Sequence, residues 1–129
     1  MADLNKKILI VEDDDVFISL LQENFKNTEF EIITARDGEE GLTKAKEEKP
    51  DLILLDILLP KMDGIEVAVK LKESAIRIPI IYLTNVKDTE RISQTMAIGG
   101  GEDDYIVKTD VRIEDVINRV RQKLHTKPQ

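Results

Sequence analysis

Five polar residues that could perform phosphoryl chemistry follow directly on apolar runs of the sequence. They are Glu12, Asp13, Asp56, Thr84 and Lys108. Asp56 closes the aliphatic run at 52–55, which lies between Pro50 and Pro60 and is too short for a buried helix. Such a run is typical of a strand that is buried on both faces of a parallel sheet. A carboxylate at its end is costly to bury unless a cation, a lysine or a chemical role compensates it.

Gathered in one crevice, Glu12, Asp13 and Asp56 would repel one another, by about 4 kcal/mol for charges roughly 4 Å apart at an effective dielectric of about 20. Proteins relieve such repulsion by protonating a group or by binding a cation. A small set of oxygen ligands with open positions suits Mg²⁺ or Mn²⁺ rather than zinc. With its charge neutralised, Asp56 could accept a phosphoryl group as a nucleophile. Lys108 and the Thr84 hydroxyl would then stabilise the phosphoryl oxygens.

Each of these residues also has an ordinary structural interpretation. An aspartate at the end of a strand can begin the next turn, and an acidic run can cap the helix that follows it. A single threonine or lysine at such a position is usually structural or simply solvated. The chemical interpretation therefore depends on whether the fold brings all five residues to one place.

The rest of the sequence alternates between apolar runs and stretches with apolar residues at helical spacing. The runs predict strands at 6–11, 30–34, 51–56, 79–84 and 105–108. The spacings predict helices at about 15–27, 37–49, 65–75, 88–99 and 113–124, with Asp37 and Asp88 as caps. We therefore expect an α/β fold of the (βα)5 type, a doubly wound parallel sheet of five strands covered on both faces. Ligands of such sheets bind at the carboxyl ends of the strands, so the five polar residues would share one rim.

Composition excludes several other classes of protein. The 129 residues carry a formal net charge of −7, which leaves no basic stripe for nucleic acid and predicts no direct nucleic-acid partner. The absence of cysteine excludes disulfides and thiolate chemistry. No apolar run approaches the roughly 18 residues that span a bilayer, and the first strand begins too early for a signal peptide. We expect a cytoplasmic protein without membrane contact, a single domain over 1–129 with its core at about 5–125 and a tail or linker stub at 126–129.

Four segments of the sequence resemble the motifs of the receiver domains of two-component response regulators. They are Ile8-Leu-Ile-Val-Glu-Asp-Asp14, Asp51-Leu-Ile-Leu-Leu-Asp56 with Leu59-Pro60 and Met62-Asp-Gly64, Pro79-Ile-Ile-Tyr-Leu-Thr84, and Asp103-Asp-Tyr-Ile-Val-Lys108. The segment that ends in Asp56 is the most specific match. The resemblance covers about residues 5–125 and implies a flavodoxin-like sheet with strand order 2-1-3-4-5.

This resemblance implies a role for each site residue. Asp56 is the phosphorylated residue, and Asp13 and Asp56 bind Mg²⁺ directly. Glu12 binds the metal through water, and Leu58 contributes its backbone carbonyl. The phosphoryl group comes from a sensor histidine kinase or a phosphotransfer protein. The domain is a signalling switch and no enzyme in the usual sense, although it assists its own phosphorylation and dephosphorylation.

The resemblance also implies how the signal leaves the site. After phosphorylation Thr84 moves inward and Tyr105 follows, which shifts the face made by the fourth helix, the fifth strand and the fifth helix. The populations of two conformers change, and a downstream protein effector binds the altered face. The domain is expected to act as a monomer or as a homodimer linked to phosphorylation.

Several positions depart from the family pattern. Thr109 stands where a proline usually follows the lysine, which leaves open whether the Lys108–Thr109 peptide bond is cis or trans. A cis bond without proline costs about 2.5–4 kcal/mol. Asn85 replaces a very small residue, and Gly99-Gly-Gly-Glu102 replaces the usual Gly-Ala before the last strand. The loops that transmit the signal thus differ from the family pattern more than the polar site does.

The resemblance also implies that two aliphatic residues stand where, in receiver domains, polar side chains can orient the water that hydrolyses an acyl phosphate. They are Leu58, two residues after Asp56, and Val86, two residues after the switch threonine. Neither can hydrogen-bond a water, and Asn85 should narrow access further. Because in-line placement of water contributes much of the hydrolysis rate, these residues predict slow decay of phosphorylated Asp56.

Alternative functions of other classes are also open at this stage. One is a pseudo-receiver, a module that binds partners without phosphorylation, which the altered loops allow. Another is an aspartate-nucleophile phosphohydrolase, but such enzymes need a second aspartate at the position of Leu58 and carry their acidic pair late in the chain. Flavodoxin-like electron transfer is disfavoured because no phosphate-binding loop follows the first strand.

Overall fold

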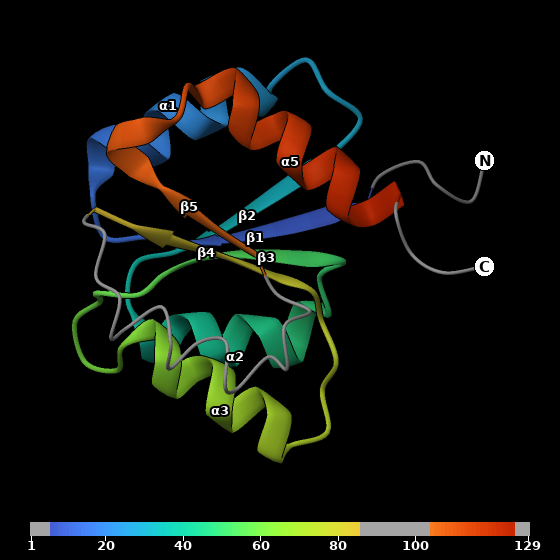
Figure 1. The fold of residues 1–129 in the computed structure, drawn as a ribbon. Coiled ribbons are helices and arrows are strands. Elements are labelled where there is room, and N and C mark those ends of the chain that lie inside the picture. Colours follow the sequence, from blue (N-terminus) through green and yellow to red (C-terminus); the bar gives the residue numbers. More distant parts are fainter. Residues whose placement is uncertain (1–5, 86–103, 126–129) are drawn as a thin grey trace.

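The computed structural model describes residues 6–85 and 104–125 and places five parallel strands between two layers of helices (Figure 1). The strands are β1 (Lys7–Val11), β2 (Glu31–Ala35), β3 (Leu52–Asp56), β4 (Ile80–Thr84) and β5 (Asp104–Val107). The described helices are α1 (Asp15–Phe25), α2 (Gly38–Glu48), α3 (Gly64–Glu73) and α5 (Ile113–His125), with a short 3-10 helix, η1, at Lys108–Asp110. The strand order is β2-β1-β3-β4-β5, which confirms the predicted fold class and sheet order.

The sheet is buried on both faces, with α1 and α5 on one side and α2 and α3 on the other (Figure 1). Side chains alternate along each strand. On β3, Leu52 and Leu54 pack into the cluster shared with α1 and α5, whereas Ile53 and Leu55 pack into the cluster shared with α2 and α3. Every residue of β3 and β4 is buried. This double burial explains why continuous apolar runs, and not alternating patterns, mark the strands in the sequence.

Two helices end earlier than predicted. Helix α1 ends at Phe25 because the Thr28 hydroxyl and N–H both donate to the Phe25 carbonyl, at 2.6 and 3.0 Å, in place of further helical bonds. Helix α3 ends at Glu73, and its cap Ser74 is followed by Ala75 in a left-handed conformation with a φ of 60°. The prediction that Ile65, Ala68, Leu71 and Ala75 mark this helix is therefore wrong for Ala75, which is exposed and lies beyond the helix end.

The last strand also differs from its predicted bounds. It ends at Val107, so Lys108 begins η1 instead of closing the strand. The predicted helix at 88–99, its cap Asp88 and the glycines at 99–101 lie outside the described residues. Within the ranges that the structure covers, no helix has the length and apolar character that crossing a membrane requires.

The predicted cap of α2 is confirmed, with one change of partner. The Asp37 carboxylate accepts a hydrogen bond from the Glu40 N–H at 2.8 Å. The Glu40 carboxylate accepts the Arg36 N–H at 2.9 Å, instead of the N–H of the cap residue itself. Both ends of the capping motif are therefore satisfied, and only Arg36 and Asp37 separate β2 from α2.

Helix α3 begins in close contact with the residue that ends β3. The Gly64 N–H donates to the Ile57 carbonyl at 2.8 Å. A Cβ atom on Gly64 would lie 2.2 Å from the Asp56 carbonyl oxygen, which is closer than non-bonded atoms can approach. Glycine at position 64 therefore sets how closely α3 packs against the backbone of Asp56.

The first prediction concerns this contact. Replacing a helical glycine by alanine normally stabilises a protein, because alanine loses less conformational entropy on folding. Gly64→Ala should instead destabilise the fold by about 1–3 kcal/mol, since the new methyl group must displace the Asp56 backbone. Urea denaturation of Gly64→Ala, beside the exposed α3 control Glu73→Ala, measures this difference. A Gly64→Ala protein as stable as wild type would show that the contact is not tight.

Candidate functional site

Glu12 and Asp56 lie side by side because β1 and β3 pair in parallel register. Val11 pairs with Leu55, and Glu12 and Asp56 are the next residues along each segment. Glu12 is fully buried and Asp56 is 3% exposed. Two carboxylates are thus taken out of water together, an arrangement that requires compensation by positive charge or by a proton.

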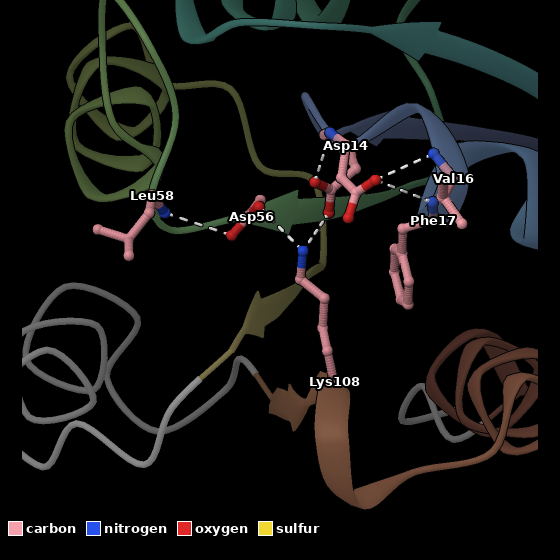
Figure 2. Close-up of polar contacts among 7 residues, drawn as sticks. Asp14, Val16, Phe17, Asp56, Leu58 and Lys108 are labelled. Atoms are coloured by element: carbon pink, nitrogen blue, oxygen red, sulfur yellow. Dashed lines mark hydrogen bonds and ion pairs between the residues drawn. The ribbon is translucent and has the colours of Figure 1, made fainter.

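Lys108 supplies one positive charge to these two carboxylates, and Figure 2 shows its side chain reaching Asp56. Its Nζ donates to Glu12 Oε1 at 2.6 Å and to Asp56 Oδ2 at 3.1 Å. Only 6% of the Lys108 side chain is exposed, so both ion pairs are shielded from water. The structure therefore brings together Glu12, Asp56 and Lys108 as the sequence predicted, although the lysine reaches the site from η1.

The titration of these groups follows from their burial and from the unequal number of charges. Burial, together with the charge of Glu12, raises the pKa of Asp56 to about 7 against the lowering effect of Lys108. Burial also disfavours the charged form of Lys108, but its hydrogen bond to Glu12 and the charge of Asp56 outweigh burial and raise the pKa of the ammonium. Lys108 thus stays charged at neutral pH, whereas the ionised form of Asp56 is disfavoured relative to that of an exposed aspartate.

Asp13 completes a set of oxygen donors around the same point. Each of Glu12, Asp13 and Asp56 offers one carboxylate oxygen, and these three oxygens lie within 4.8 Å of one another. Asp13 is exposed while the other two are buried, so one side of the set is open to water. An all-oxygen set with excess negative charge and an open side fits Mg²⁺ or Mn²⁺. The side chains that are present thus match the predicted metal.

Backbone N–H groups orient both buried carboxylates (Figure 2). The Asp14 N–H donates to Glu12 Oε2 at 2.9 Å, and the Leu58 N–H donates to Asp56 Oδ1 at 3.3 Å. The Leu58 side chain is half exposed, at 50%. Leu58 therefore contacts Asp56 through its N–H, while the role of its carbonyl as a metal ligand stays a prediction.

The remaining predicted residues lie around this cluster. Thr84 is buried and ends β4, where it pairs with Val107. Because side chains alternate along a strand, Thr84 lies on the same face of β4 as Ile80 and Tyr82, which pack against α2 and α3. Tyr105 is partly buried against the same cluster, and Asn85 is exposed. Val86 lies outside the described residues.

The open question about the lysine loop is answered by the backbone. The structure has no cis peptide bond among its described residues, so the bond between Lys108 and Thr109 is trans. Thr109 is exposed within η1. Lys108 therefore reaches Asp56 without the cis bond that the family pattern would suggest.

One residue near the cluster has no predicted site role. The Phe17 ring on α1 lies under the Lys108 ammonium, with 4.7 Å between Nζ and the ring centroid. From the sequence alone, Phe17 is one of several apolar residues at helical spacing in the first helix. Only its place in the first turn after the acidic segment distinguishes it from the others.

Comparison with known proteins points to one family. The family model described as the response regulator receiver domain matches residues 8–121. The alkaline phosphatase synthesis transcriptional regulatory protein PhoP of Bacillus subtilis is 43% identical over 122 residues, which cover 90% of this chain and 50% of PhoP. The DNA-binding response regulator MtrA of Mycolicibacterium smegmatis is 33% identical over 124 residues, covering 96% of this chain and 53% of MtrA. A CheY-like receiver domain protein from Methanospirillum hungatei has a solved structure with a TM-score of 0.84 and 30% identity, and the match covers 93% of this chain and 94% of that one.

The chain spans about half the length of these curated relatives. MtrA is named as a DNA-binding protein. The prediction from net charge that this chain has no nucleic-acid partner therefore receives no support from the relatives.

The second prediction tests the balance of charge in the cluster. Lys108→Met should destabilise the protein by about 3–5 kcal/mol near pH 8, because it leaves two buried carboxylates without their cation. Adding Asp56→Asn to Lys108→Met should recover part of this loss, since one charge is then removed. Chemical denaturation measures both variants.

The matched control is Lys61→Met, which removes an exposed ammonium whose ion pair with Asp37 is 3.7 Å long. It should cost no more than about 1 kcal/mol. Equal losses for the two lysine variants would contradict the account of the buried cluster.

Proposed function

This chain belongs to the response regulator receiver domain family, and from that membership we propose that it is a phosphorylation-dependent switch that accepts a phosphoryl group on Asp56. The observation that carries the proposal is the burial of Asp56 beside Glu12, with the Lys108 ammonium 3.1 Å from Asp56 Oδ2. A buried carboxylate is costly unless it is paired and hydrogen-bonded, and here one ammonium serves two such carboxylates. The arrangement supplies a nucleophile and a cation to receive the phosphoryl oxygens.

The proposed step is a simple displacement at phosphorus. A carboxylate oxygen of Asp56 attacks the phosphorus of a phosphohistidine on a sensor histidine kinase or a phosphotransfer protein. A new P–O bond forms, the P–N bond breaks, and its electron pair stays with the imidazole. Bound Mg²⁺, held by Asp13 and Asp56 with Glu12 through water, would neutralise charge on the transferring group.

Residues of the chain then adjust to the new group. Lys108 is placed to turn from Asp56 Oδ2 toward a phosphoryl oxygen, while the Leu58 N–H remains on the acceptor residue. The Thr84 hydroxyl donates to another phosphoryl oxygen. Thr84 lies on the same face of β4 as the residues that pack against α2 and α3, so it approaches from the side opposite Lys108. Tyr105 packs on that same side and moves with it. Phosphorylation thereby changes the populations of two conformers.

We propose that residues 1–129 act as one receiver domain with its core at about 5–125, and that the domain works in the cytoplasm. Its output is contact with a downstream protein effector through the face that includes β5 and α5, as a monomer or as a phosphorylation-linked homodimer. The chain assists its own phosphorylation and dephosphorylation. A pseudo-receiver, which binds partners without phosphorylation, is the alternative that the experiment below decides.

The third prediction is phosphoacceptance at Asp56. With acetyl phosphate and Mg²⁺, wild type should gain one phosphoryl mass that hydroxylamine removes, because hydroxylamine cleaves acyl phosphates. Asp56→Asn should gain none. Intact-mass measurement reads both results.

Asp51→Asn provides the matched control, since Asp51 precedes the same strand and its carboxylate accepts a structural hydrogen bond from the Lys7 N–H, at 2.8 Å. It should be phosphorylated like wild type. If wild type takes up no phosphoryl group at millimolar Mg²⁺, the pseudo-receiver is the better description.

The fourth prediction is a slow decay of the phosphorylated protein. Leu58 is half exposed next to Asp56, and its aliphatic side chain cannot orient an attacking water. Leu58→Asn/Val86→Glu should shorten the lifetime of the acyl phosphate by about tenfold or more, because it supplies groups that can position and activate water. Decay is followed by intact mass after removal of the phosphodonor.

The control for this series is Leu20→Asn, which changes another half-exposed leucine, 46% accessible and on α1. Its acyl phosphate should decay at the wild-type rate. Equal lifetimes in wild type and in Leu58→Asn/Val86→Glu would mean that backbone geometry alone sets the rate.

A further inference from the structure

The Lys108 ammonium has an aromatic neighbour in addition to its two carboxylate partners. Its Nζ lies 4.7 Å from the centroid of the Phe17 ring, within the range of a cation–π interaction. Figure 2 shows the ring of Phe17, from α1, beside the path along which Lys108 reaches Asp56. The contact joins α1 to the residue that follows β5.

The ring replaces water around part of the ammonium. A lysine ammonium has three N–H donors, and here Glu12 and Asp56 accept two hydrogen bonds. With 6% of the side chain exposed, little water can reach the remaining side. An aromatic face attracts a desolvated cation more strongly than a solvated one. Phe17 thus stabilises the buried charge without adding another carboxylate to a cluster that already has too many.

The position of Phe17 is fixed by the same acidic segment that contributes to the site. The Asp14 carboxylate accepts the Val16 N–H at 2.9 Å and the Phe17 N–H at 3.4 Å, which caps the first turn of α1. The Asp14 N–H donates to Glu12, the partner of Lys108. A closed chain of contacts therefore runs from Lys108 through Glu12 and Asp14 to Phe17 and back to Lys108.

We propose that Phe17 is a positioning residue for phosphoryl transfer, whose ring holds the Lys108 ammonium at Asp56 while leaving it free to turn toward the phosphoryl group. This inference rests on the proposed function. A hydrogen-bond acceptor in place of the ring would fix the ammonium in one direction. A ring face attracts it over a range of positions, so Lys108 can exchange one oxygen partner for another without losing this contact.

Progressive fluorination of the Phe17 ring tests this role, because each fluorine weakens the negative face of the ring with little change of shape. The rate of phosphorylation by acetyl phosphate and Mg²⁺ should fall step by step, to about tenfold slower with pentafluorophenylalanine. Phe17→Tyr, which keeps the ring face, should stay within about twofold of wild type. The same series at Phe25, a fully buried ring of α1 that packs on Phe30, should leave the rate unchanged.

A spectroscopic measurement makes the result independent of turnover. In wild type the methylene protons next to Lys108 Nζ should be shifted upfield by the ring current of Phe17, and Phe17→Leu should remove that shift. If wild type is phosphorylated and fluorination of Phe17 leaves the phosphorylation rate unchanged, the role of Phe17 is overturned and the proposed function stays intact. A wild type that takes up no phosphoryl group overturns the proposed function, while the ring-current shift still reports whether the contact exists.

Discussion

The site depends on one ammonium that is shared by two buried carboxylates. Lys108 Nζ bonds Glu12 Oε1 and Asp56 Oδ2, at 2.6 and 3.1 Å. The parallel sheet brings these groups together by placing the carboxyl ends of β1, β3 and β5 on one rim. Because one positive charge cannot balance Glu12, Asp56 and the nearby Asp13, the rim carries excess negative charge that a further cation would offset.

The two faces of the sheet give the site two separate connections to the rest of the domain. Lys108 contacts α1 through Phe17, in the layer formed by α1 and α5. Thr84 and Tyr105 lie on the faces of β4 and β5 that are directed at the other layer, α2 and α3. A group bound to Asp56 can therefore act on both layers at once. Such a design suits a switch, since one local change of charge biases the packing on both sides of the sheet.

Much of this arrangement could be predicted from the sequence because it follows from strong local signals. The apolar runs before Asp56 and Thr84 are buried on both faces, so burial alone marks the strands and their ends. The role of Asp37 as a helix cap is equally predictable, since its carboxylate accepts a hydrogen bond from a residue three positions later, Glu40. Phe17 and Lys108 are 91 positions apart in the chain, and their contact depends on how α1 packs over the sheet. No local pattern records such a contact, which is why the sequence indicates Phe17 only as a core residue.

The central claim is that Asp56 is a buried carboxylate whose charge is incompletely balanced until a cation binds. The most direct measurement is a pH titration of the Asp56 side-chain carboxyl carbon by ¹³C NMR, with Asp56→Asn used to assign the signal. Without metal, the midpoint should lie near the pKa of about 7 that burial and Glu12 impose. Saturating Mg²⁺ should lower it, because a cation favours the ionised form. A midpoint near the ordinary aspartate value of about 4 that Mg²⁺ leaves unchanged would contradict the account.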